Sequence, residues 1–277
     1  MTVKKFQALI YAFYEKEGRH TLPWRPPMLL VRKDGSINPY KVLVSEVMLQ
    51  QTQVARVLPK YAAWMKKFPN IHALARASLK DVLLLWQGLG YSRRAKSLHE
   101  LSTYSIKEYN GEIPRDEKEL TALPGIGSYA ANALRAFAFN LPAVLLETNI
   151  RTAIIHHYFK NNEKVSDTDI KKVLENVADK NNSRIWYYAL MDYGASLKTQ
   201  GISHNVKSKH YAKQTKFKGS PRQVRGEILK VLAYGAMSEK RLVEKLSVRS
   251  VELVREKIRE LLKEKLISKK NRKLDLG

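Results

Sequence analysis

The residue best placed to do chemistry is Glu46, a carboxylate within the apolar and amide stretch Ser45-Glu-Val-Met-Leu-Gln-Gln-Thr-Gln53. Apolar periodicity predicts a helix over 40–58, which sets Glu46 next to Met48. The residues that share its helical face are Val42, Leu49 and Gln53. Desolvation on such a face raises the pKa of a carboxyl and makes a proton donor near neutral pH. The alternative is a glutamate that caps a turn or pairs with a nearby base, and spacing alone favours that structural role.

A second motif, Leu123-Pro-Gly-Ile-Gly-Ser128, lies between a helix expected to end near Ala122 and one expected to start at Ser128. Gly125 and Gly127 let the backbone turn tightly and come close to another group. The N-terminus of the following helix offers free N–H groups to a phosphate. This form is the helix-hairpin-helix signature, which grips the DNA backbone without reading sequence. A Gly-X-Gly turn by itself, however, joins many unrelated pairs of helices.

Helices must position these groups, because apolar residues recur at three- and four-residue spacing along most of the chain. The predicted helices cover 3–16, 40–58, 79–86, 93–109, 129–139, 149–158, 167–178 and 184–198. Strand patterns are almost absent before residue 265. The segment 26–39 is expected to be a long loop with a small hairpin at Lys33-Asp34-Gly35. We therefore expect a mainly α fold.

The formal charge of +24, from 50 basic and 26 acidic residues, implies a polyanionic partner. Nucleic acid is favoured over an anionic membrane, because no isolated basic amphipathic helix with a bulky apolar face is evident. The basic stretch 199–220 is expected to be a linker that tracks phosphates, with Lys207, Lys209 and Lys213 in contact with DNA. The alternative is a solvated tether.

The 277 residues include no cysteine, which excludes disulfides, zinc–thiolate sites and cysteine-held iron–sulfur clusters. We accordingly expect no metal and no cofactor. No apolar run is long enough to span a bilayer, and the start of the chain lacks a signal-peptide stretch. We expect a protein of the cell interior, cytoplasmic and nucleoid-associated or otherwise intracellular.

Residues 221–277 are expected to form a separate small unit. Helical patterns over 222–234, 238–246 and 250–265 precede two short segments around a turn at Asn271, which is typical of a winged helix-turn-helix. Its second basic helix would face a DNA groove with Arg249, Arg255, Lys257, Arg259 and Lys263. Glutamates alternate with these bases, so a protein-binding winged helix is an equal alternative.

Several motifs, taken together and in order, resemble the A/G-specific adenine DNA glycosylases. They are Leu22-Pro-Trp-Arg25, Pro39 to Val54, Leu85-Trp-Gln-Gly-Leu-Gly-Tyr91, the hairpin motif and Tyr187 to Ala195. The resemblance covers about 3–200 and implies the two-domain helix-hairpin-helix glycosylase fold. The expected domains are 1–25 with 140–200, a helical barrel over 26–139 that carries the hairpin, the linker 199–220, and the winged-helix-like unit 221–277.

The resemblance implies that Glu46 is the catalytic acid that protonates the adenine ring. The family's second carboxylate is an aspartate, and the matching segment here is Glu147-Thr-Asn-Ile-Arg151, with glutamate in that place. Glu147 would face the oxocarbenium-like sugar, as in glycoside hydrolysis, and Asn149 would hold the carboxylate or a water. The added methylene moves the carboxylate by about a bond length, and a misplacement of about 1 Å can cost about 100-fold in rate. Alternatively, Glu147 only caps the helix at 149–158.

Tyr129 stands where related bifunctional enzymes carry a Schiff-base lysine, so the resemblance implies base removal without strong AP lyase activity. Gln51 and Tyr91 match positions that fill the gap or wedge the strands when the target base is flipped out. The matching positions of the base pocket are Leu22, Trp24, Val54, Asp192 and His20, where His20 replaces a family arginine. Trp24 and Val54 would also suit an ordinary core.

The family's cluster cysteines would fall near Lys198, Asn205, Ser208 and Gln214, so the resemblance implies an enzyme without that cluster. The C-terminal unit does not resemble the family's domain that senses 8-oxoguanine. The function expected is excision of adenine mispaired with G or 8-oxoguanine from double-stranded DNA that contains a mismatch or damaged base, by a monomer. Two alternatives stay open: a thymine or uracil mismatch glycosylase, and a non-catalytic DNA-binding module.

Overall fold

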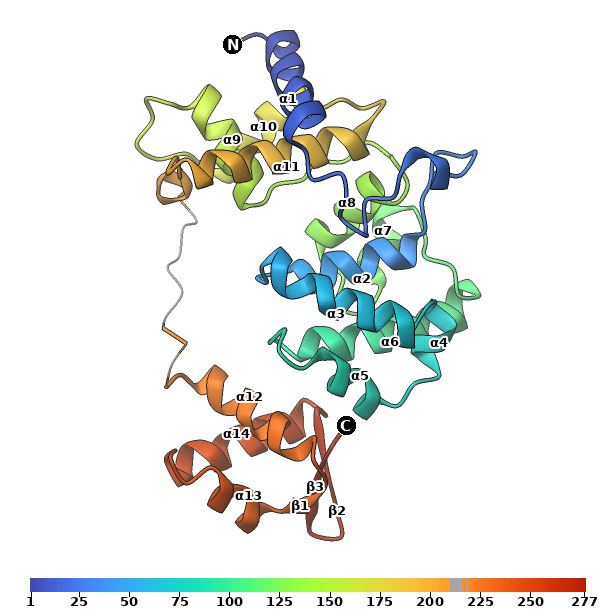
Figure 1. The fold of residues 1–277 in the computed structure, drawn as a ribbon, viewed down its shortest axis with the longest axis vertical. Helices are drawn as coiled ribbons and strands as arrows, with labels where there is room; N and C mark the ends of the chain where they lie inside the picture. The colour runs from blue at the N-terminus through green and yellow to red at the C-terminus, as the bar shows by residue number, and fades with distance from the viewer. Residues whose placement is uncertain (210–215, 218) are drawn as a thin grey trace. The chain divides into compact units, whose positions relative to one another are not determined.

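The computed structural model describes residues 1–209, 216–217 and 219–277, and they confirm a mainly helical chain (Figure 1). The chain divides into two compact units, each described by itself. Unit 1 comprises 1–46, 113–122 and 126–213, and unit 2 comprises 47–112, 123–125 and 214–277. These limits differ from the domain limits expected from the sequence, which stay a prediction. None of the described helices is long and apolar enough to cross a membrane.

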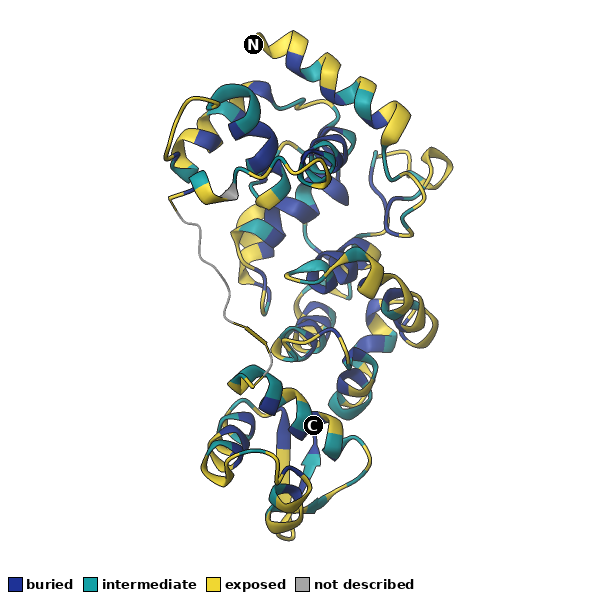
Figure 2. Cartoon of the chain, turned by 60° about the vertical axis from the view of Figure 1, so that its left-hand side comes forward, coloured by how far each residue is buried: buried dark blue, intermediate teal, exposed yellow. Residues whose placement is uncertain are grey.

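Unit 1 contains α1 (Val3–Glu17), a 3-10 turn (Met28–Leu30), α7 (Glu117–Ala122), α8 (Ser128–Phe137), α9 (Thr148–Tyr158), α10 (Asp167–Val177), α11 (Ser183–Thr199) and most of α2 (Pro39–Leu49). Its core lies where α1, α9 and α11 pack together. Phe6 of α1 meets Trp186 of α11 edge to face, with ring centroids 5.9 Å apart. Both residues are fully buried, and Figure 2 colours the chain by the burial of each residue, with buried positions in dark blue.

The helix expected over 40–58 is two helices, α2 and α3 (Val54–Lys67), interrupted at residues 50–53. Gln51 has a φ of 55°, a left-handed conformation that no helix interior accommodates. Gln53 is the N-cap of α3, so it does not continue the face that carries Glu46. The hairpin expected at 33–35 is a tight turn closed by a 2.8 Å bond from Arg32 N to Ser36 O, and no strand flanks it among the described residues.

Unit 2 contains α4 (Ile71–Ala75), α5 (Leu79–Trp86) and α6 (Arg93–Tyr109) beside α3. Polar side chains begin these helices: Asn70 caps α4 and Ser78 caps α5 by accepting a backbone N–H three residues later. Buried Trp64 and Trp86 meet edge to face at 5.6 Å and fill the space between α3 and α5.

The C-terminal residues form a winged-helix-like arrangement within unit 2. It consists of α12 (Pro221–Leu232), β1 (Met237–Ser238), α13 (Glu239–Lys245), α14 (Val251–Lys263), β2 (Ile267–Lys270) and β3 (Lys273–Leu276). The sheet is antiparallel with the order β1-β3-β2, and Lys270 pairs with Lys273 across the turn. The strands β2 and β3 lie where the sequence predicts them. The two-residue strand β1 has no such signal, because so short a strand shows no alternation.

Candidate active site

Glu46 lies in α2 and is only 8% exposed. Burial raises the pKa of its carboxyl to about 7; the nearby charge of Arg25 lowers it and that of Glu147 raises it further. Within the described part of the chain this carboxyl has no hydrogen-bond or ion-pair partner, so the capping or paired glutamate that spacing alone favours is not what the structure shows. With a pKa of about 7, about half of these carboxyl groups carry a proton at neutral pH, and the protonated form can donate it.

Glu147 is the N-cap of α9, and its side chain folds back over the start of the helix. Its Oε1 accepts hydrogen bonds from Asn149 N at 2.8 Å and from Ile150 N at 2.7 Å. The N-terminus of a helix favours a negative charge, and Glu147 places its carboxyl group there. The capping role considered from the sequence is therefore observed, and Oε2 accepts one further hydrogen bond, from Thr148 Oγ1 at 3.3 Å.

Tyr129 belongs to the first turn of α8 and is half-buried. Burial raises the pKa of its phenol well above the usual value, and the charges of Glu46 and Glu147 raise it further. Its hydroxyl is therefore neutral. Because the same two carboxyl groups influence each other and this phenol, unit 1 brings Glu46, Tyr129 and Glu147 into one electrostatic environment although they are far apart in sequence.

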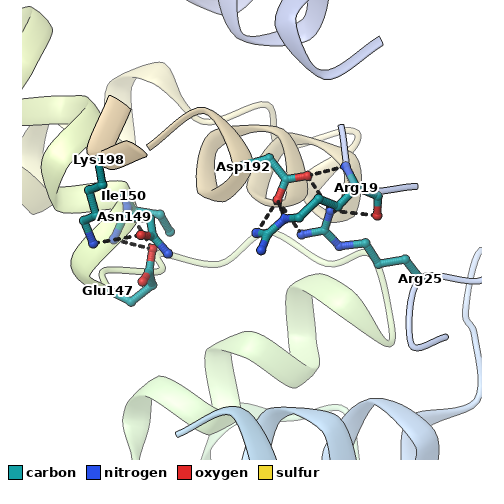
Figure 3. A network of polar contacts seen from close by, with 7 residues as sticks. All are labelled: Arg19, Arg25, Glu147, Asn149, Ile150, Asp192 and Lys198. Atoms are coloured by element: carbon teal, nitrogen blue, oxygen red, sulfur yellow. Dashed lines mark hydrogen bonds and ion pairs between the residues drawn. The ribbon is translucent and has the colours of Figure 1, made fainter. Parts of the chain in front are cut away.

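The side chain of Asn149 is held by a lysine that the sequence did not single out as part of the site. Lys198 Nζ of α11 donates to Asn149 Oδ1 at 2.8 Å, as Figure 3 shows. Burial lowers the pKa of Lys198, and the charge of Glu147 opposes that shift. Glu147, Asn149 and Lys198 thus form one connected group at the start of α9.

Asp192 of α11 is buried and binds two arginines rather than lining an open pocket edge (Figure 3). Arg25 Nη1 donates to Asp192 Oδ2 at 2.7 Å, and Arg19 Nε donates to Oδ1 at 2.7 Å. Burial raises the pKa of Asp192, but the bonds from Arg25 and Arg19 outweigh this and leave it lowered. Asp192 therefore anchors the segment that contains Trp24 to α11.

A cavity of about 400 Å³ is lined by residues 20–27 and by side chains between Leu30 and Val42. It includes Leu22, Trp24 and His20 from the expected base pocket, while Glu46, Glu147 and Tyr129 are not among its lining residues. Trp24 is 5% exposed, as a core residue would be. The His20 ring packs on Tyr14 with a centroid distance of 4.4 Å, and its Nε2 lies 2.8 Å from Tyr14 O.

Unit 2 carries Gln51 and Tyr91, both exposed and both with left-handed backbone, at φ of 55° and 47°. Arg94 holds the two loops together. Its Nη1 donates to Val47 O at 2.7 Å and to Gln50 O at 2.5 Å, and its Nη2 donates to Gly90 O at 3.1 Å. Such strained residues persist only where the surroundings hold them, and they concentrate at functional sites. The sequence offers no signal for Arg94 beyond its place just after the Gly-Leu-Gly-Tyr turn.

The hairpin residues are found where the motif predicts. Gly125 has a φ of 77°, and a Cβ there would lie 2.5 Å from Ser97 Cβ of α6, so only glycine fits. Gly127 is the N-cap of α8, and Ser128 is its exposed first residue. Asn132 Nδ2 donates to Glu117 Oε1 at 2.9 Å and ties α8 to α7. Val54 is the first residue of α3 in unit 2 and is half-buried.

Comparison with known proteins identifies the family. Residues 44–179 match the model of the HhH-GPD superfamily base excision DNA repair proteins. The adenine DNA glycosylase of Mycolicibacterium smegmatis is 34% identical over 231 residues, covering 78% of this chain and 76% of that protein. The chain belongs to the adenine DNA glycosylases of this superfamily.

The adenine DNA glycosylase of Buchnera aphidicola subsp. Baizongia pistaciae is 38% identical over 70% of this chain and 53% of that protein. The chain therefore spans between about half and three quarters of the length of these curated relatives. Among solved structures, a thermostable thymine-DNA glycosylase superposes with a TM-score of 0.58 at 25% identity, over 70% of this chain and 86% of that chain. Its fold is the fold expected from the sequence.

The positions that match the family's cluster cysteines do not suit an iron–sulfur cluster. Lys198 is an ammonium bound to Asn149, and Ser208 bears a hydroxyl in place of a thiolate. Backbone bonds tie the segment down instead: Val165 N donates to Lys207 O at 2.9 Å, and Lys209 N donates to Val165 O at 3.1 Å. Within the described residues no group of three histidines, cysteines or acids could hold a metal.

Three lysines of the basic linker are expected to contact DNA. Lys207 Nζ donates to Lys160 O at 2.8 Å. Among the described residues no carboxylate forms an ion pair with the Lys207 ammonium. Lys209 is exposed. Lys213 lies outside the described residues.

Proposed function

We propose that this protein is a monofunctional DNA glycosylase that hydrolyses the N-glycosidic bond of adenine mispaired with G or 8-oxoguanine in double-stranded DNA. The observation that carries the proposal is the buried Glu46, whose pKa of about 7 is set by burial and by its neighbour Glu147. Two carboxyls that interact but occupy different environments divide into a proton donor and an anion.

In the proposed reaction Glu46 gives its proton to a ring nitrogen of adenine. The bond between the base nitrogen and the sugar then breaks, its electron pair leaves with the base, and the sugar becomes an oxocarbenium-like cation. Glu147 faces this cation as an anion held at the start of α9. A water then adds to the anomeric carbon and loses a proton, which completes the hydrolysis.

The remaining roles follow from position. Tyr129 is a neutral phenol that cannot form an imine, so strand cleavage by a lyase step is not expected. Leu22, Trp24 and His20 border the cavity and are proposed to contact the flipped base together with Val54. Asp192 is proposed to act indirectly, by holding Arg25 in place through a hydrogen bond. Gln51, Tyr91, Gly125, Gly127, Ser128 and the lysines 207, 209 and 213 are proposed to contact DNA.

The experiment that tests the proposal uses a panel of duplexes containing A:G, A:8-oxoG, T:G and U:G pairs. Abasic product is cleaved with alkali and resolved by strand length. We expect product from the strands that contain mispaired adenine. The structural similarity to a thymine-DNA glycosylase makes product from T:G the second candidate outcome, and absence of product from every duplex contradicts the proposed activity.

We also propose that the enzyme works without an iron–sulfur cluster, as a monomer inside the cell, where its DNA substrate is. The chain has no cysteine to hold such a cluster. Protein purified from iron-depleted cells is expected to fold and excise like protein from iron-replete cells. A visible cluster absorbance that tracks with activity contradicts this.

A further inference from the structure

We propose that Lys198 is a positioning residue that orients the Asn149 amide within the glycosylase site. The inference rests on the proposed function. Its basis is the 2.8 Å hydrogen bond from Lys198 Nζ to Asn149 Oδ1, drawn in Figure 3.

An ammonium group can only donate hydrogen bonds, so its partner on the asparagine must be the amide oxygen. This contact therefore decides which way the amide points. With Oδ1 engaged, the Nδ2 end is left to donate to a water or to a substrate oxygen. Without the lysine, Asn149 could rotate its amide and present an acceptor where a donor is needed.

The backbone brings Lys198 to this place. A Cβ on Gly194 of α11 would lie 2.0 Å from Asn149 O, so α9 and α11 touch backbone to backbone there. Lys198 follows Gly194 by four residues and so lies on the same face of α11, one turn further on. A longer residue at 194 would separate the helices and move the ammonium out of reach.

Charge supports the same assignment. Glu147 lies close enough to Lys198 to oppose the lowering of its pKa by burial. The ammonium therefore sits beside both members of the Glu147–Asn149 pair, although the family resemblance matches its position to a cluster cysteine. Lys198 cannot be a ligand of an iron–sulfur cluster, and its hydrogen bond to Asn149 instead connects α11 directly to the start of α9.

The test is a double-mutant cycle read out as single-turnover excision rate and as duplex affinity. We expect K198M to slow excision about 10-fold to 100-fold, the size of effect that loss of orientation produces, while Kd changes less than about two-fold. K198R, which still donates, is expected to recover most of the rate. In an N149A background, K198M should have little further effect, because coupled residues are non-additive.

Each outcome bears on the proposal. A K198M rate equal to that of the wild type, or an undiminished K198M effect in the N149A background, overturns the positioning role while leaving the glycosylase assignment intact. An inactive wild type overturns the proposed function instead. Should K198M melt below the assay temperature, K198R decides the question, because its guanidinium also only donates hydrogen bonds; loss of rate in a folded K198R overturns the role.

A second inference comes independently from the C-terminal winged-helix-like residues: the geometry points to the β2–β3 turn as a contact for the nucleic-acid backbone. Residues 268–273 are all exposed, and four of these six are cations: Lys269, Lys270, Arg272 and Lys273. Lys269 lies 3.7 Å from Glu239, but the other three have no ion-pair partner within the described residues. The turn between the strands has left-handed backbone at Asn271 and Arg272, which makes a short, defined hairpin.

Among the five cations that the sequence offered as groove-facing, in even balance with a protein-binding role, Lys257 and Arg249 already pair closely with carboxylates. Lys257 is buried against Glu256 and Glu260 at 2.8 and 2.6 Å. Arg249 precedes α14 and pairs with Glu227 at 2.7 Å. Cations already neutralised by carboxylates release fewer counterions from DNA, so the turn offers the stronger phosphate contact.

The test compares two triple variants on a matched duplex that holds no target base, so it does not depend on excision. The turn variant is K270Q/R272Q/K273Q, and the matched control is R249Q/R255Q/K257Q, which removes three cations that pair with carboxylates at or beside α14. We expect the turn variant to reduce the slope of log K against log salt by about 2 to 3, at about 0.9 per phosphate contact, and the control to change it by less than about 1. An unchanged slope for the turn variant, or an equal or larger change for the control, overturns this inference.

Discussion

At the scale of single residues, the proposed site depends on two carboxyl groups in different surroundings. Glu46 is buried without a hydrogen-bond or ion-pair partner in the described part of the chain, whereas Glu147 receives two backbone N–H groups. Two groups of the same chemistry are therefore expected to take the opposite roles proposed for them. Substituting each glutamate by glutamine keeps the shape of the side chain and removes its acid group, so the two proposed roles can be tested one at a time.

We expect E46Q to abolish excision while duplex binding persists, because glutamine cannot supply the proton. The excision rate of the wild type should fall as pH rises above about 7, the pKa that burial gives Glu46. A single-turnover pH profile and a binding isotherm measure both effects. An active E46Q would show that another group is the acid.

The same substitution, E46Q, is expected to abolish excision but to raise the stability of the fold. The folded pKa of about 7 lies above the ordinary value of 4.5, so the fold loses stability as pH rises from 4.5 to 7 and does not regain it at higher pH. E46Q removes this cost and should stabilise the protein at pH 8 by up to about 3 kcal/mol, at about 1.4 kcal/mol per pKa unit. Urea unfolding at pH 8 and at pH 4.5 measures it, and an equal gain at both pH values would contradict the assignment.

For Glu147 we expect the capping hydrogen bonds to affect stability and the negative charge to affect the excision rate, so that different substitutions change each property. E147Q keeps a side-chain oxygen for Asn149 N and Ile150 N and should change stability little, yet slow excision strongly because the anion is gone. E147A also loses the cap, at a cost of about 1 kcal/mol in unfolding free energy. If E147Q retains the wild-type rate, Glu147 is a cap and no more.

At the scale of elements, the site depends on how closely α9 and α11 approach. No side chain fits between these helices at Gly194, because a Cβ on that residue would lie 2.0 Å from Asn149 O. The close approach places Asn149 and Lys198 within hydrogen-bond distance. The packing of α9 on α11 thus sets the positions of the candidate site residues Asn149 and Lys198.

We expect G194A to destabilise the fold by about 3 kcal/mol or more, because overpacking against backbone cannot be relieved by a rotamer change. Excision should fall further than stability explains, since Asn149 moves with α9. The matched control is G226A: Gly226 lies in α12, and nothing would come within 4 Å of its new Cβ. That variant should gain about 0.5 to 1 kcal/mol from helix propensity. Similar unfolding midpoints for both variants would contradict the close approach.

At the scale of the whole molecule, we expect the excess of positive charge to govern how the protein binds DNA. With +24 formal charges, many phosphates can be neutralised at once. Counterion release then makes binding strongly dependent on salt. This effect is shared by many cations, so no single lysine should dominate it.

We expect duplex affinity to fall by about 10³-fold or more between 50 and 200 mM salt, the range for six or more phosphate contacts. Fluorescence anisotropy with a labelled duplex and the E46Q protein measures this without turnover. A nearly flat dependence would show that the excess charge lies away from the DNA contact.

Local patterns in the chain are enough to predict the helical class, most helix boundaries, the hairpin and the family, because periodicity, glycine turns and motif order are local properties. The resemblance also points to Glu46, Tyr129, Glu147 and Asn149 as candidate site residues, and their roles stay a prediction. Residues whose roles come from long-range contact were beyond the reach of the sequence. The break between α2 and α3, the arginines bound to Asp192, the Arg94 contacts and the Lys198–Asn149 bond all required the tertiary structure.

The physical reason is the same in each case. A pKa, an ion pair or a hydrogen bond depends on what lies within a few ångströms, and chain spacing does not encode that for residues 49 or 167 positions apart. Burial raises the pKa of Glu46, for which spacing alone favours an ordinary structural role. The packing of α9 on α11 brings Lys198 to Asn149, a contact that no motif indicates.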